Sequence, residues 1–145
     1  MYNSKQIALN FIKSFENSYE QVLSFLLDEC IIEYPYADSL NTSSKLNKYD
    51  YSIYLKNALK AMNDFKVSDI EIYSVSENLV WAEFCGESFQ LGIKLGLGKK
   101  YSQKYVVRIK FKKGLIINYK EYWNPLALTP NTSNTQIKEI FKKEN

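Results

Sequence analysis

Residues 113–126 read KGLIINYKEYWNPL, and this stretch decides how the chain folds. A Lys-Gly turn leads into a predicted strand, which Pro125 ends because proline has no N–H to donate to a neighbouring strand. Successive side chains of a strand point to opposite faces, so alternate residues of this segment share one face. The predicted face consists of Leu115, Ile117, Tyr119, Glu121 and Trp123.

Glu121 is the one carboxylate in this row of apolar and aromatic groups. An ionised acid in such surroundings must be paired, hydrated or shifted in pKa. One interpretation is a general acid or base in a hydrophobic cavity, where desolvation raises the carboxyl pKa and brings proton transfer near neutral pH. The other is a structural carboxylate that accepts hydrogen bonds from backbone groups or tyrosine hydroxyls. The sequence leaves both open.

The composition predicts one globular domain over residues 1–145, of which residues 129–145 form a loosely attached C-terminal tail with a short helix. The chain has 145 residues, 46% of them hydrophobic and 15% aromatic, which is enough for a single core. Twelve tyrosines and eight phenylalanines predict a core or cavity with many large rings, some of which present a hydroxyl group to it.

Composition also excludes several classes of function. The net charge is only +3, and Arg108 is the one arginine, so the clustered arginines of a nucleic-acid interface are missing. The absence of histidine excludes Ser-His and Cys-His catalytic pairs, and with two isolated cysteines it argues against a zinc site. We therefore expect no metal and no cofactor. No apolar run reaches 18 residues, so we expect no membrane partner and a cytoplasmic location.

The order of predicted elements indicates an α+β fold. Apolar stripes predict helices, and longer apolar runs that follow them predict strands joined by tight turns. The helices are expected at residues 4–16, 18–28 and 48–63, and the strands at 30–34, 67–75, 79–91, 100–112 and 115–123. The apolar stripe of the third helix consists of Ile53, Tyr54, Ala58, Ala61 and Met62. Ser18 and Gln21 form a capping box at the start of the second helix. Long antiparallel strands after helices suggest a curved sheet wrapped around them.

Both faces of the long strands carry apolar side chains. Tyr105, Val107 and Ile109 point one way, whereas Val106 points the other. If the helices cover one face, a second copy of the chain is the simplest cover for the opposite face. We therefore expect a homodimer.

Four segments resemble one protein family in the expected order. They are IEYPYA at 32–37, VWAEF at 80–84, KYSQKYVV at 100–107 and EYWNPL at 121–126. Together they resemble the SnoaL-like branch of the nuclear-transport-factor-2-like superfamily, which includes polyketide cyclases and ketosteroid-isomerase-like proteins. The closing segment is also similar to that of the phenazine-biosynthesis A/B proteins. The resemblance covers residues 4–128, and it specifies a fold more closely than a function.

The resemblance implies a cone: a strongly curved antiparallel sheet with the N-terminal helices packed in its concave face and an apolar pocket at the wide end. It also implies dimers. Glu121 matches the acidic residue that acts in acid–base chemistry in the phenazine-biosynthesis proteins. Those proteins also use a histidine in the pocket, and this chain has none.

Further residues are candidates for ligand binding. Four tyrosine hydroxyls could donate hydrogen bonds to a carbonyl or enolate oxygen, namely those of Tyr34, Tyr36, Tyr105 and Tyr119. Trp123 shares the face of Glu121, and Gln103 shares the face of Tyr105. Glu83 points either into the pocket or toward the dimer surface, and the alternation of residues does not decide between the two.

The resemblance, together with these residues, implies a protein that binds a hydrophobic, cyclic small molecule. With Glu121 as acid or base, the expected chemistry is cofactor-free isomerisation, cyclisation or dehydration in secondary metabolism. The alternative is a non-catalytic ligand-binding or dimeric assembly module. An enzyme requires an open cavity beside Glu121, whereas a scaffold tolerates a filled one.

Overall fold

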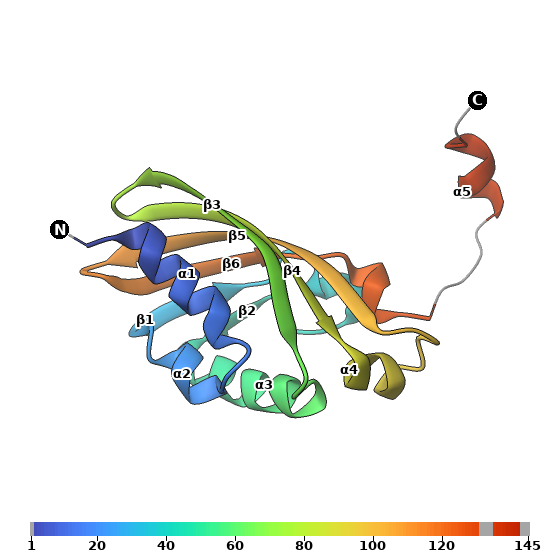
Figure 1. Cartoon of the computed structure of the whole chain (residues 1–145), viewed down its shortest axis with the longest axis horizontal. Helices are drawn as coiled ribbons and strands as arrows, with labels where there is room; N and C mark the ends of the chain where they lie inside the picture. The colour runs from blue at the N-terminus through green and yellow to red at the C-terminus, as the bar shows by residue number, and fades with distance from the viewer. Residues whose placement is uncertain (1, 131–134, 143–145) are drawn as a thin grey trace.

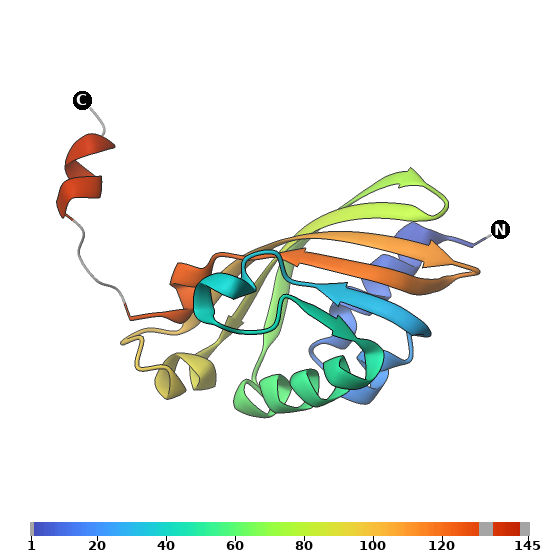
Figure 2. The same ribbon diagram turned by 180° about the vertical axis from the view of Figure 1, so that it is seen from behind.

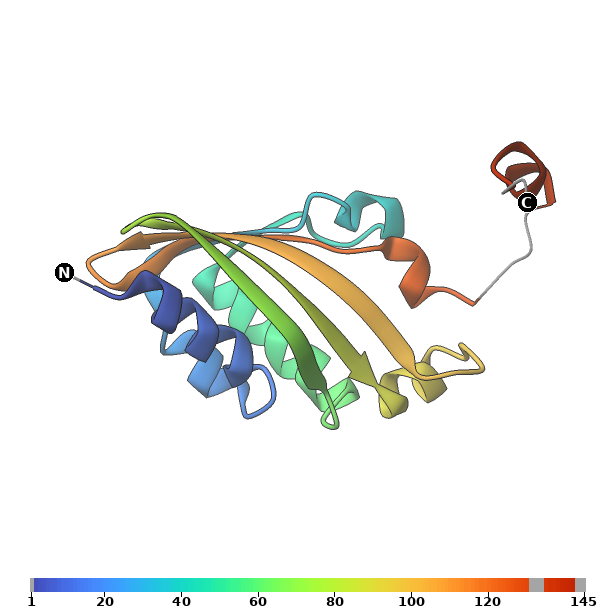
Figure 3. The same ribbon diagram turned by 45° about the horizontal axis from the view of Figure 1, so that its top comes forward.

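The computed structural model describes residues 2–130 and 135–142, and six strands form one curved sheet in the order β2-β1-β6-β5-β4-β3. Helices α1, α2 and α3 all lie against one side of it (Figures 1 and 3). The strands are β1 (Leu26–Glu33), β2 (Lys45–Asn47), β3 (Lys66–Ser76), β4 (Leu79–Ser88), β5 (Tyr101–Lys112) and β6 (Leu115–Tyr122). The helices are α1 (Ser4–Ser14), α2 (Tyr19–Leu23), α3 (Lys48–Ala61), α4 (Phe89–Lys94) and α5 (Thr135–Ile140), with short 3₁₀ helices η1 (Ala37–Leu40) and η2 (Pro125–Leu128).

The sheet confirms the predicted α+β cone, with one difference in strand direction. Strands β3 to β6 form the expected antiparallel meander, but β1 runs parallel to β6, with Ile32 opposite Tyr119. Parallel neighbours require a long crossover, and the chain between these two strands contains α3 and the other strands of the meander. The sheet is therefore mixed.

A bulge in β6 corrects the predicted face of this strand. Lys110 lies opposite Asn118, whereas Phe111 lies opposite Ile116, so Ile117 is an extra residue in the ladder. Ile116 consequently joins Tyr119 in the core, and Leu115 is exposed. The predicted alternation is therefore wrong for Leu115 and Ile117 and holds from Tyr119 onward.

The turn that precedes β6 forms as predicted. Lys113 and Gly114 have φ angles of 52° and 80°, the left-handed pair that a two-residue hairpin requires. This turn places β6 antiparallel beside β5 in the sheet.

The second predicted helix is much shorter than expected. The Ser18 hydroxyl accepts a hydrogen bond from the Gln21 N–H at 3.2 Å, as the capping box predicts. The helix ends at Leu23, however, and β1 begins at Leu26, whose partner in β6 is Ile116. Sheet pairing takes these apolar residues out of the helix and lengthens the predicted strand at 30–34.

Phe11 of α1 anchors the helical layer in the concave face. Its ring packs edge-on against Phe15, Phe25 and Tyr119, with a centroid distance of 5.0 Å to Tyr119. Such aromatic pairs add to the stabilisation from burial alone. These aromatic side chains fill one end of the cone.

Helix α4 replaces the end of the predicted strand 79–91. The Ser88 hydroxyl accepts from the Leu91 N–H at 3.0 Å and donates to Asp64 at 2.5 Å. Asp64 also accepts the Phe89 N–H at 2.9 Å. These bonds satisfy the first N–H groups of the helix, so the chain turns there instead of extending β4.

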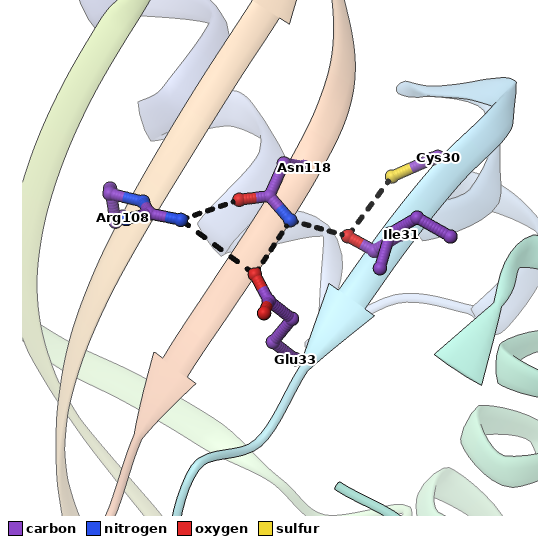
Figure 4. Close-up of polar contacts among 5 residues, drawn as sticks. All are labelled: Cys30, Ile31, Glu33, Arg108 and Asn118. Atoms are coloured by element: carbon purple, nitrogen blue, oxygen red, sulfur yellow. Dashed lines mark hydrogen bonds and ion pairs between the residues drawn. The ribbon is translucent and has the colours of Figure 1, made fainter. Parts of the chain in front are cut away.

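A polar cluster on the opposite, outer face of the sheet joins β1, β5 and β6 (Figure 4). Arg108 donates to the Asn118 side chain at 2.9 Å and lies 3.7 Å from the Glu33 carboxylate. Asn118 donates to Glu33 at 3.0 Å and to the Ile31 carbonyl at 3.1 Å. Arg108 thus serves as an ion-pair partner on the outer face of the sheet.

The C-terminal tail is described in part. Its residues 131–134 and 143–145 lie outside the described residues, and α5 stands away from the sheet with Ile140 and Phe141 exposed (Figure 2). Across residues 2–130 and 135–142, no helix combines the length and apolar character that a membrane span requires.

Candidate functional site

A cavity of about 250 Å³ lies between the concave face of the sheet and α3. Its walls are mainly aromatic and aliphatic. The lining residues are Phe15, Tyr34, Leu40, Thr42, Tyr54, Leu55, Ala58, Ala61, Met62, Phe65, Phe84, Leu91, Leu95, Tyr101, Tyr105, Glu121, Trp123 and Leu128. Such a lining, with a few polar groups, is typical of a small-molecule site.

Helix α3 supplies one wall, and its orientation differs in part from the predicted stripe. Tyr54, Ala58 and Met62 face the cavity as the stripe implies, and Tyr51 and Leu55 are fully or nearly buried. Ile53, a predicted member of the stripe, is instead 48% exposed. The apolar arc of the helix is rotated toward Tyr51 because that side meets the sheet.

Glu121 is the only charged side chain among the described residues that line the cavity. It lies in β6 opposite Val107 of β5, whose side chain is also inside. The Tyr119 hydroxyl donates a hydrogen bond to Glu121 Oε1 at 2.7 Å. The two sequence candidates Tyr119 and Glu121 therefore form one hydrogen-bonded pair.

Burial raises the pKa of Glu121 to about 7 from an ordinary value of 4.5. Desolvation disfavours the carboxylate, and the hydrogen bond from Tyr119 acts in the opposite direction because it stabilises the charged form. The half-buried side chain is surrounded by protein, and its accessible part faces the cavity. Near neutral pH such a carboxyl group can either give or take a proton.

Tyr34 and Trp123 lie in the same cavity wall. Their ring centroids are 6.3 Å apart, and Tyr34 also packs at 5.3 Å against Tyr54. Burial raises the pKa of Tyr34 and that of Tyr54 well above the usual value of a tyrosine. Both hydroxyls thus stay protonated, and each can donate a hydrogen bond.

A second polar group in the cavity is a pair of tyrosines on β5. The hydroxyl oxygens of Tyr101 and Tyr105 are 2.8 Å apart, and both side chains are buried. Phe84 stacks on Tyr105 with a centroid distance of 4.8 Å. This stacking fixes the ring of Tyr105 within the wall.

Gln103 does not line this cavity, although it lies on the same face of β5 as Tyr105. Its side-chain amide donates to the Asn124 carbonyl at 2.9 Å, and its oxygen accepts the Asn124 N–H at 2.8 Å. The structure thus uses Gln103 to hold the chain that follows β6, which positions Trp123.

Tyr36 and Glu83 also lie outside the cavity. Tyr36 is 51% exposed and packs edge-on against Tyr122 at 5.7 Å. Glu83 is exposed on the outer face, where its neighbours in the ladder are Glu71 and Val106. The helices cover the other face of the sheet, so Glu83 points away from the pocket. This is the second of the two positions that the alternation of residues left open for Glu83.

The sequence alone did not identify Tyr54 or Tyr101 as residues of the cavity. Tyr101 shares the inward face with Tyr105, so the alternation of β5 was a usable signal. Tyr54 belongs to the predicted helical stripe, which was assigned to packing. Within the described part of the chain, no three Cys, Asp or Glu side chains gather as a metal site would require.

Comparison with known proteins supports the fold. No protein-family model matches the chain. Protein YesE of Bacillus subtilis (strain 168) is 28% identical over 102 residues, which cover 70% of this chain and 67% of YesE.

Two solved structures share the architecture. An NTF2-like protein from Anabaena variabilis superimposes with a TM-score of 0.66 and 18% identity, over 86% of this chain and 92% of its own. IdmH from Streptomyces antibioticus, provisionally assigned as a polyketide cyclase, gives a TM-score of 0.72 and 9% identity, over 88% and 96% of the two chains. The chain therefore has the nuclear-transport-factor-2-like fold that its resemblance to SnoaL-like proteins predicts.

Proposed function

We propose that the protein binds a hydrophobic, cyclic small molecule in the cavity and that Glu121 transfers a proton to or from it. The observation that carries this proposal is a single carboxyl group with a pKa of about 7 in an otherwise uncharged, largely apolar cavity. The hydrogen bond from Tyr119 also suits a structural carboxylate, so the position of Glu121 in the wall of an open, apolar cavity is what favours the chemical role. No ion pair of Glu121 occurs among the described residues, and Tyr119 is its hydrogen-bond partner.

The chemistry that suits this arrangement is cofactor-free proton transfer. As a carboxylate, Glu121 would remove a proton from carbon next to a carbonyl group, and as a carboxylic acid it would return that proton at another position. This cycle supports isomerisation, cyclisation or dehydration. The provisional assignment of IdmH as a polyketide cyclase agrees with this class of reaction on the same fold.

A cavity-filling substitution tests the binding step. Ala58→Trp should place a large ring in the cavity and weaken binding of the two-ring hydrocarbon tetralin at least tenfold, because Ala58 lines the wall opposite the sheet. Ile53→Trp is the matched control, since Ile53 lies on the same helix but is 48% exposed. Binding is measured by NMR titration, with an expected dissociation constant of the wild-type protein below about 1 mM.

The result that contradicts the proposal is equally direct. If wild-type protein shows no saturable binding of tetralin, or if Ala58→Trp and Ile53→Trp bind it as well as wild type does, the cavity is not the ligand site. A non-catalytic binding module would pass this test, so the proton-transfer step requires a separate one.

We also propose that two copies of the chain associate through the outer face of the sheet. This face has an acidic half and a basic half: Glu71 and Glu83 lie on β3 and β4, and Lys104, Lys110 and Lys120 lie on β5 and β6. A two-fold axis would bring the acidic strands of one copy onto the basic strands of the other, around exposed Val106. Sedimentation equilibrium should give twice the chain mass, and a single-chain mass up to 100 µM or so would exclude a stable dimer.

A further inference from the structure

The cavity wall beyond the end of β6 depends on a side chain of β5. The last pair in the ladder between these two strands is Val106 and Tyr122, so the described residues that follow Tyr122 have no partner in the ladder of β5. Trp123 is nevertheless buried, and it lines the cavity. Because strand pairing ends before Trp123, another contact must hold this part of the chain in the wall.

The side-chain amide of Gln103 takes the place of a strand partner. Its nitrogen donates to the Asn124 carbonyl at 2.9 Å, and its oxygen accepts the Asn124 N–H at 2.8 Å. A side-chain amide offers the same donor and acceptor as a peptide group, so the two bonds match those that a hydrogen-bonded pair exchanges in an antiparallel ladder. Gln103 is buried, and loss of the amide would leave the Asn124 backbone groups without these partners.

Asn124 lies between two residues of the cavity wall. Trp123 precedes it directly, and Leu128 is the last residue of η2. The Asn124 side chain accepts the Leu126 N–H at 3.0 Å, which fixes the start of η2. The anchor at Asn124 therefore determines where both wall residues stand.

Glu121 is held by different contacts. It is still within the ladder, opposite Val107, and it accepts the hydrogen bond from Tyr119. Its position is thus fixed by β5 and by its own strand, two residues before the anchored segment begins. The contacts that hold the wall at Asn124 are separate from those that hold the carboxyl group.

We propose that Gln103 is a positioning residue that limits the ligand to one or two rings, because it holds Trp123 and Leu128 against the cavity. This inference rests on the proposed function. A cavity of about 150 Å³ holds one benzene molecule, so the 250 Å³ here suits one or two rings and is small for three fused rings. Without the two bonds from Gln103, the chain at Asn124 can move away from the concave face, and the cavity widens at Trp123.

Two probes that differ by one fused ring test this inference. Quinoline has two rings and acridine has three, and both are uncharged at pH 8.5, where their binding is measured by NMR titration. Wild-type protein should bind acridine at least tenfold more weakly than quinoline, about the effect of a steric misfit in an apolar pocket. Gln103→Met keeps the side-chain length without the amide, and it should raise the acridine-to-quinoline affinity ratio about tenfold.

Two further variants make the comparison specific. Gln103→Glu keeps an acceptor for the Asn124 N–H but loses the donor, so it should shift the ratio in the same direction. It decides the question if urea unfolding shows that Gln103→Met is not folded. Ser102→Met is the matched control, since Ser102 is the neighbouring residue on the exposed face of β5, and it should keep the wild-type ratio.

A double-mutant cycle shows whether Gln103 acts through the wall. Trp123→Ala should itself admit acridine, and adding Gln103→Met to it should give less than a twofold further gain, because the ring that Gln103 positions is already gone. A merely destabilising effect of Gln103→Met would add to that of Trp123→Ala. An equal gain in both backgrounds would overturn the inference.

The remaining outcomes separate the two proposals. If wild-type protein does not bind quinoline, the cavity is not the ligand site, and the proposed function fails together with this inference. If wild-type protein binds both probes equally well, or if the folded Gln103 variants keep the wild-type ratio, Gln103 does not limit ligand size. In that case only this inference is wrong, and the proposed function of the cavity stands.

Discussion

Glu121→Gln should reduce protein-catalysed proton exchange of 2-tetralone by at least 100-fold. The amide has nearly the same size as the carboxyl group and can still accept the hydrogen bond from Tyr119, but it cannot take a proton from carbon. Loss of a positioned acid or base costs about 10²–10⁴ in rate. Exchange is followed in D₂O by NMR or mass spectrometry, and the rate without protein is subtracted at each pH.

The pH profile of the wild-type rate gives an independent check on this prediction. Because the carboxylate is the active form of the base, the rate should rise with pH and reach half its maximum near pH 7, the pKa of Glu121. Glu29→Gln is the control, since this exposed β1 residue lies outside the cavity. A Glu121→Gln rate within threefold of wild type would remove Glu121 from the chemistry and favour a binding module.

The second large effect concerns stability. Glu121→Gln should stabilise the protein at pH 8.5 by up to about 3 kcal/mol and leave its stability at pH 4 unchanged within about 0.5 kcal/mol. The reason is that burial raises the pKa of Glu121 from 4.5 in the unfolded chain to about 7 in the folded protein. Wild type therefore carries an unfavourable buried charge at high pH, and the neutral amide does not.

The sign of this effect follows from proton binding. Between about pH 4.5 and pH 7 the folded protein binds more protons at Glu121 than the unfolded chain does, so this residue makes wild-type stability fall as the pH rises. Its contribution is fully present below pH 4.5 and is lost above pH 7. Urea unfolding of wild type and variant at several pH values gives the difference directly, with Glu29→Gln as the surface control. A difference that does not depend on pH would show that the carboxyl group is not desolvated.

The sequence was sufficient to predict the general architecture and the inward direction of Glu121. Alternation along the second half of β6 places Tyr119, Glu121 and Trp123 on one face, and the structure agrees. Alternation fails before Tyr119 because the bulge at Ile117 depends on how β6 pairs with β5. The parallel pairing of β1 with β6 could not be predicted from the alternation of residues either, because strand direction depends on the path of the whole chain.

Several side-chain roles could not be read from a single strand. Gln103 has the correct parity for the cavity, yet its amide binds the backbone of Asn124, a partner that becomes adjacent only when β6 ends beside β5. Glu83 could have faced either side, because alternation identifies two faces without saying which one the helices cover. Tyr36 lies beyond the end of β1, where strand parity no longer applies.

The central claim is that a lone carboxyl group in an apolar cavity titrates near neutral pH. A ¹³C NMR titration of the Glu121 side-chain carboxyl carbon, assigned by comparison with Glu121→Gln, measures this property directly. We expect a midpoint near pH 7. A midpoint near pH 4.5, the ordinary value for glutamate, would contradict the claim and leave Glu121 as a hydrated structural acid.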